Sequence, residues 1–277
     1  MEKENLDFLK DRLYFLGFGE QFNKTLEQKM KAGDEKFKLG TEANLESMGK
    51  MKKIHYELDF AKSKENDRWF LNNYTATLSE AGKVQGQQKI FLNFGSGLSA
   101  REAFNMLETR AVHKKMKTKD KREFEAWNVI DFTKKDDHGN NKIQMYSQGW
   151  NYDLSKALHK HPIKELQTPE QKDELMRSLR KGNLTEVNFV INKEDVKHHI
   201  AANPKDRNVI VYDANFVRLT PIVPENEKSQ NQRQDRSEGL VFSAPGKNSK
   251  DAKEASELKQ NDETAETRKG KKSGQRM

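Results

Sequence analysis

The feature that most constrains the fold of this chain is a series of short strand-like segments joined by short connections. Ile54, Tyr56, Leu58 and Phe60 alternate with polar residues, which is the period of a strand with one face on a core. Further strands are expected at 70–78, 90–94, 124–132, 143–145, 184–191, 196–201 and 208–212. Parallel strands need crossover connections of about a dozen residues or more. The connections between successive strands are shorter, so they predict antiparallel hairpins.

Five short amphipathic helices are expected beside these strands, near residues 6–16, 22–30, 99–107, 153–158 and 168–179. Two of them have a marked start, because Ser99-Ala100-Arg101-Glu102 and Thr168-Pro169-Glu170-Gln171 both have the pattern of a capping box. Gly182 is placed to end the last helix. The sequence therefore predicts an α+β fold of short amphipathic helices and antiparallel β-hairpin sheets.

The composition changes after Val223, and this change sets the expected domain organisation. Residues 224–277 hold 12 Lys/Arg and 10 Asp/Glu, a net of 12 − 10 = +2 out of +8 for the chain, with no Trp or Tyr. The apolar surface of this segment is too small to offset the entropy lost when a chain becomes ordered. This polar C-terminal tail is therefore expected to be disordered. We expect an N-terminal α+β domain at 1–160 and a smaller domain, a helix with a three-stranded meander, at 161–223.

The composition also argues against several classes of function. The chain has no Cys, which excludes disulfides, thiolate nucleophiles and zinc fingers. No apolar run approaches the roughly 20 residues that span a bilayer, so we expect a cytoplasmic protein without membrane contact. No G-x-S-x-G motif is present, and the carboxylates are interleaved with Lys. We therefore expect a non-enzymatic protein without cofactor or metal.

A cluster of basic residues at 113–122 is the strongest functional signal. It contains Lys114, Lys115, Lys117, Lys119, Lys121 and Arg122, with one Asp. Clustered ammonium groups displace counterions from phosphates, which predicts salt-dependent binding of DNA or RNA without strong sequence specificity. Trp127 is expected to be exposed for base stacking, because it lies opposite the face that carries Phe124, Ala126 and Ile130. The alternative is a solvated connector between a helix and a strand.

Three other patterns have weaker functional interpretations. Gly95–Ala100 matches G-x-G-x-x-A and could hold a phosphate, but a tight turn before a capped helix explains it as well. Histidines at 159, 161, 198 and 199 do not predict a metal site, because adjacent residues of a strand point to opposite faces. Leu240, Val241 and Phe242 form the one apolar cluster of the tail, and they are expected to contact a partner protein unless they arise by chance.

Several stretches of residues 5–219 resemble a family of domains of unknown function carried by conjugative and mobilisable elements of Bacteroidetes. They include LKDRLYFLGFG at 9–19, AFNMLETRAV at 103–112, AWNVIDF at 126–132, and the segments 152–154, 161–166, 180–183, 202–204 and 211–215. Members of this family resemble regions appended to DNA-processing proteins, type IA topoisomerases among them. The resemblance implies an accessory protein of a mobile element that binds nucleic acid. The alternative that it implies is an interaction module for a DNA-processing or transfer protein.

Overall fold

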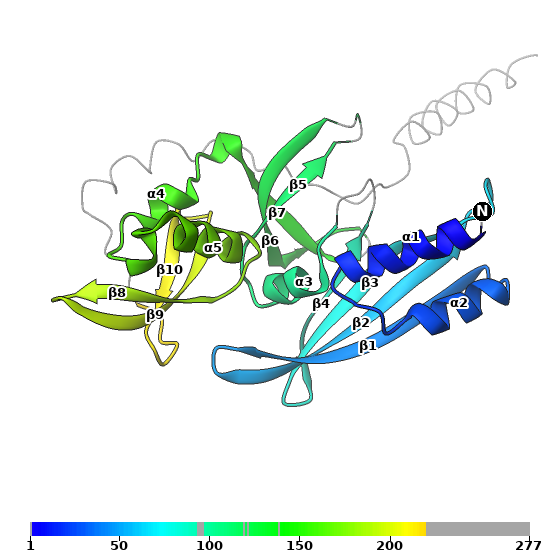
Figure 1. Cartoon of the computed structure of the whole chain (residues 1–277), viewed down its shortest axis with the longest axis horizontal. Coiled ribbons are helices and arrows are strands. Elements are labelled where there is room, and N and C mark those ends of the chain that lie inside the picture. Colours follow the sequence, from blue (N-terminus) through cyan, green and yellow to red (C-terminus); the bar gives the residue numbers. More distant parts are fainter. Residues whose placement is uncertain (1, 93–96, 119, 121, 138, 220–277) are drawn as a thin grey trace, which may run out of the picture. The chain divides into compact units, whose positions relative to one another are not determined.

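The computed structural model describes residues 2–92, 97–118, 120, 122–137 and 139–219, and these residues form an α+β fold. Their strands make three antiparallel sheets, accompanied by short helices (Figure 1). The predicted fold class is therefore confirmed. The tail at 224–277, with its Leu240–Phe242 cluster, lies outside the described residues.

The first sheet has four strands in the order β1-β2-β3-β4. The strands are β1 (Lys36–Ser47), β2 (Lys50–Lys62), β3 (Trp69–Glu80) and β4 (Lys83–Phe91). Strand β1 is not among the strands expected from the sequence. Its alternation weakens after Leu39, because Gly40 follows and small or polar residues occupy most of the rest of the strand. Pairing with β2 along its whole length stabilises it instead.

Three helices bury the apolar face of this sheet: α1 (Glu2–Phe15), α2 (Asn23–Lys31) and α3 (Ala100–Leu107). Leu13 of α1, Leu26 of α2 and Phe104 of α3 are fully buried in one core with Ile54 and Leu58 of β2. Each such side chain contributes about 1.5–3 kcal/mol to folding. No helix in the described part of the chain combines the length and the apolarity needed to cross a membrane.

The second sheet shows that the basic segment is a strand and not a connector. Its strands are β5 (Val112–Lys117), β6 (Glu123–Lys135) and β7 (Asn141–Ser147), in the order β5-β6-β7. Val112 and Ile130 belong to the first core, whereas Trp127 and Tyr146 belong to a second one. This sheet therefore contributes to both cores.

The second core is completed by the third sheet and its helices. These are η2 (Gln148–Trp150), α4 (Leu154–Leu158), η3 (Lys164–Leu166), α5 (Pro169–Arg180), β8 (Thr185–Ile191), β9 (Glu194–Asn203) and β10 (Asn208–Tyr212). The three strands form the expected meander, in the order β10-β9-β8. The core joins residues on both sides of position 160, such as Leu158 and Leu179. A domain border at 160 stays a prediction.

The two predicted capping boxes have different outcomes. At α3 the Ser99 hydroxyl accepts from the Glu102 backbone N–H, and the Glu102 carboxylate accepts from the Ser99 N–H, so this capping box is confirmed. At α5 the prediction is wrong. The Thr168 side chain donates to the Gln171 side chain and makes no hydrogen bond to the helix backbone. Pro169 at the first position, which has no N–H, is the remaining helix-start signal there.

Gly182, in the turn between α5 and β8, lies against the start of β5. Its φ of +78° is in the left-handed region, and an added Cβ would lie 2.8 Å from Val112 Cγ2 and 2.9 Å from the Ala111 carbonyl oxygen. Gly33, which follows α2, has almost the same φ of +77°, but no atom lies within 4 Å of its added Cβ. A comparison of the two glycines therefore separates the effect of backbone strain on stability from the effect of crowding.

We predict that Gly182→Ala lowers the free energy of unfolding by about 2–4 kcal/mol, since strain and crowding both act there. Gly33→Ala should lower it by about 1 kcal/mol, since only the backbone conformation is disfavoured. Urea unfolding of both variants measures the difference. Equal losses would show that the contact of Gly182 with β5 does not matter for stability.

Candidate nucleic-acid interface

The basic cluster lies on the hairpin formed by β5 and β6. The side chains of Lys115, Lys117 and Arg122 are exposed by 82%, 46% and 80%, respectively. Strand pairing places Lys115 opposite Glu125 and Lys117 opposite Glu123 on β6. Lys119 and Lys121, the other two lysines expected near the turn, lie outside the described residues.

Each of these three exposed cations has an acidic partner on the hairpin itself. Lys115 lies 3.5 Å from Glu125, Lys117 lies 3.1 Å from Glu123, and Arg122 lies against Asp120. These partners are also exposed. Ion pairs of this kind contribute only about 0–1 kcal/mol each. A phosphate can therefore replace these partners at low cost.

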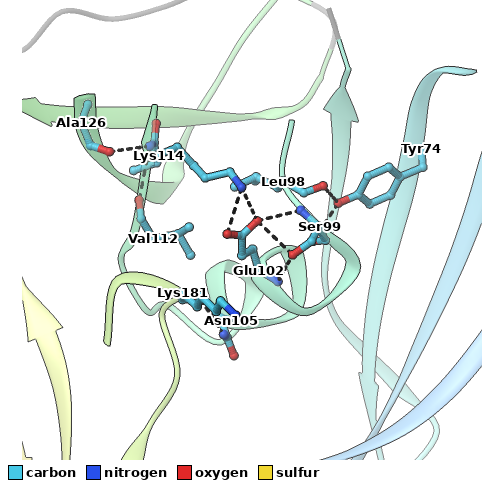
Figure 2. A network of polar contacts seen from close by, with 10 residues as sticks. Tyr74, Leu98, Ser99, Glu102, Asn105, Val112, Lys114, Ala126 and Lys181 are labelled. Carbon is cyan, nitrogen blue, oxygen red and sulfur yellow. Dashed lines mark hydrogen bonds and ion pairs between the residues drawn. The ribbon is translucent and has the colours of Figure 1, made fainter. Parts of the chain in front are cut away.

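Lys114 has a different environment from the rest of the cluster (Figure 2). Its Nζ lies 2.8 Å from Glu102 Oε2, and that oxygen also accepts from the Ser99 N–H and the Ser99 hydroxyl. The Glu102 side chain is only 8% exposed, so the ion pair is largely shielded from water. If the Lys114 side chain left Glu102 to bind a phosphate, the buried Glu102 carboxylate would lose its cation. We therefore assign Lys114 to the framework of the hairpin.

The same network occupies the helix start that the Gly95–Ala100 pattern would offer to a phosphate. The Ser99 N–H donates to the Glu102 carboxylate at 2.8 Å, and the Glu102 N–H donates to the Ser99 hydroxyl. A carboxylate thus already lies where a bound anion would lie. The described part of this turn therefore supports the interpretation as a turn before a capped helix.

The expectation that Trp127 is exposed is wrong, because its side chain is 5% exposed. Its ring packs edge-on against Tyr152 at 5.3 Å and lies 5.0 Å from the ring of His113. Trp127 lies on the central strand of a sheet that contributes to both cores. A residue that points away from one core therefore points toward the other and not into solvent. Trp127 is core and cannot stack on a base in this conformation.

A buried arginine that no sequence pattern singled out connects three segments. Arg110 donates from Nε to the Gly182 carbonyl, from one terminal nitrogen to the Ser47 hydroxyl and from the other to Asn105 Oδ1, at 2.8–2.9 Å. Asn105 in turn donates to the Lys181 carbonyl. Burial lowers the pKa of Arg110 to about 10, so the guanidinium stays charged at neutral pH. Two segments quoted for the family resemblance, 103–112 and 180–183, meet here.

Two of the four histidines, His161 and His198, stack on one aromatic ring. The Phe189 ring stacks with His161, at 5.7 Å, and with His198, at 4.3 Å. Among the described residues no group of His, Asp and Glu side chains is arranged to hold a metal ion. Burial is the main cause that lowers the pKa of His161, and neighbouring Asn208 opposes it. Burial therefore favours a neutral His161.

Comparison with known proteins gives no match among protein-family models, curated proteins or solved structures. The resemblance to the mobile-element family stays a hypothesis that rests on the quoted segments.

We predict that the protein loses stability as the pH falls from about 7.5 to about 5. Burial holds the folded-state pKa of His113 and of His161 below the roughly 6.5 of an unfolded histidine. Well above pH 7 both histidines are neutral in the folded and in the unfolded chain. As the pH falls through about 6.5, the histidines of the unfolded chain bind protons before those of the folded chain, and this stabilises the unfolded chain. The His113→Gln/His161→Gln variant should have a smaller loss over this range. Chemical unfolding at several pH values tests this, and an unchanged slope in the variant would contradict it.

Proposed function

We propose that this chain is a non-enzymatic, cytoplasmic accessory protein that binds nucleic-acid backbone through the exposed end of the β5–β6 hairpin. The observation that carries the proposal is the exposure of Lys115, Lys117 and Arg122 on one hairpin, each held only by an exposed acid. From 115 to 125 the sequence has five Lys/Arg and three Asp/Glu, a net of 5 − 3 = +2. The hairpin end therefore carries an excess of positive charge.

Lysine charges of this kind recognise phosphate and not bases. An ammonium group is a compact point charge, whereas a guanidinium has a rigid fork, so of the three exposed cations only Arg122 has the fixed two-pronged geometry that suits a guanine edge. The buried Trp127 offers no stacking surface. Contacts with phosphates give affinity without sequence information. The affinity falls steeply as the salt concentration rises, because binding releases counterions from the nucleic acid and this release is less favourable at high salt. The basic run at 268–272 adds further charge to the chain.

We predict that the full chain binds DNA at low salt and that Lys115→Gln/Lys117→Gln/Arg122→Gln weakens binding about tenfold or more, with a smaller dependence of affinity on salt. The matched control is Lys24→Gln/Lys83→Gln/Lys205→Gln, which removes the same charge from exposed sites on other elements. Fluorescence anisotropy with single- and double-stranded DNA across salt concentrations measures both effects.

Two outcomes would contradict this proposal: no binding at low salt, or equal losses in the hairpin variant and its control. The first would favour the alternative of a protein-interaction module. For that function α1 offers a surface, since Phe8, Tyr14 and Phe15 are exposed on it.

A further inference from the structure

The outer edge of β1 is the longest strand edge in the described structure, and no described strand pairs with it (Figure 1). Three other sheet edges are covered. The side chains of Asn140 and Asn141 bond to the backbone of Lys89 and Gln87 on β4. The Val190 N–H on β8 donates to the Pro162 carbonyl, and the Leu219 N–H donates to the Val211 carbonyl on β10. Long open edges are rare, because they invite pairing with another chain.

The pairing of β1 with β2 determines which backbone groups of β1 face outward. The Lys62 N–H donates to the Glu35 carbonyl at 2.7 Å, which identifies the 35–62 pair as hydrogen-bonded. Hydrogen-bonded and non-hydrogen-bonded pairs alternate along an antiparallel ladder. The odd-numbered residues of β1 therefore bond to β2, and the even-numbered residues direct their N–H and C=O groups outward. Those residues run from Lys36 to Glu46, with Gly40 among them.

The charges of these outward-bonding residues are separated along the strand. Lys36 and Lys38 occupy the first part, whereas Glu42 and Glu46 occupy the second. Against an antiparallel copy of itself, such a strand places positive residues beside negative ones. Charges on edge strands commonly prevent association, but a strand with this order of charges attracts its own copy.

We propose that β1 pairs antiparallel with β1 of a second copy of this chain, about a two-fold axis at Thr41 that is perpendicular to the sheet. This register uses the strand from Lys36 to Glu46. It places Lys36 opposite Glu46 of the second copy, and by symmetry Glu46 opposite Lys36 of that copy. Every outward-bonding residue then has a partner in the hydrogen-bonding position. The interface is isologous, as two-fold symmetry requires.

The apolar side of β1 supports the same register. Phe37 and Leu39 are buried, but Ala43 and Leu45 are only partly buried although they pack against the first core. In the register about Thr41, Leu45 of one copy lies opposite Phe37 of the other, and Ala43 lies opposite Leu39. The apolar layer beneath the two sheets then continues across the axis. Cross-strand pairs of this kind stabilise a sheet.

A charge exchange at Lys36 and Glu46 tests the proposal, because neither residue has a described ion-pair partner whose loss would disturb the fold. Lys36→Glu and Glu46→Lys each place like charges opposite one another at two symmetric positions. Each single variant should weaken dimer formation about tenfold or more. The double variant Lys36→Glu/Glu46→Lys should dimerise like the wild type. An equimolar mixture of the two single variants should form a heterodimer.

Sedimentation velocity of the full chain over a range of concentrations measures these states, with Lys205→Glu as a control that should not change them. Circular dichroism and thermal unfolding check that each variant is folded. A wild type that stays monomeric would overturn the proposal. So would a dimer that resists both single variants, or a mixture that forms no heterodimer, because another partner surface or register would then be in use.

Discussion

The buried guanidinium of Arg110 is the interaction on which the arrangement of the other elements depends. It bonds to Ser47 at the end of β1, to Asn105 of α3 and to Gly182 beyond α5, and so connects segments that belong to the two hydrophobic cores. A buried charge is costly unless its hydrogen bonds are made. The three partners must therefore stay together while Arg110 stays buried. Asn105 and Gly182 strengthen the junction, through a side-chain amide and through the close approach that only glycine permits.

The position of this junction explains why part of the basic cluster has a structural role. Lys114 lies on β5, a few residues after Arg110, and it reaches back to Glu102 on the helix that also carries Asn105. The cluster thus divides into an inner cation that fixes β5 to α3 and outer cations that face solvent. A contiguous charge run in a sequence does not reveal this division, because it depends on the depth of each strand position.

Local signals predicted much of the fold. The alternation at 54–60 and the Ser99 capping box predict their elements correctly, since the residues that stabilise them lie close together in the sequence. Apart from the Thr168 capping box, which fails locally, the misses depend on contacts with other segments. β1 and β5 contain Lys, Glu or Gly at many positions and form because a neighbouring strand pairs with them. Trp127 is buried because two cores meet at one sheet, and Arg110 gains its partners from positions 47 and 182.

The most direct test of this account uses the three Trp residues as separate reporters of the two cores. Trp69 lies in the first core, whereas Trp127 and Trp150 belong to or pack against the second. With Arg110 present, urea unfolding followed by Trp69 alone, in Trp127→Phe/Trp150→Phe, should coincide with unfolding followed in Trp69→Phe. Arg110→Ala should lower stability by about 3–5 kcal/mol and separate the two transitions, because it leaves buried partners unpaired and disconnects the cores. Coincident transitions with a loss under about 1 kcal/mol would contradict the central role of Arg110.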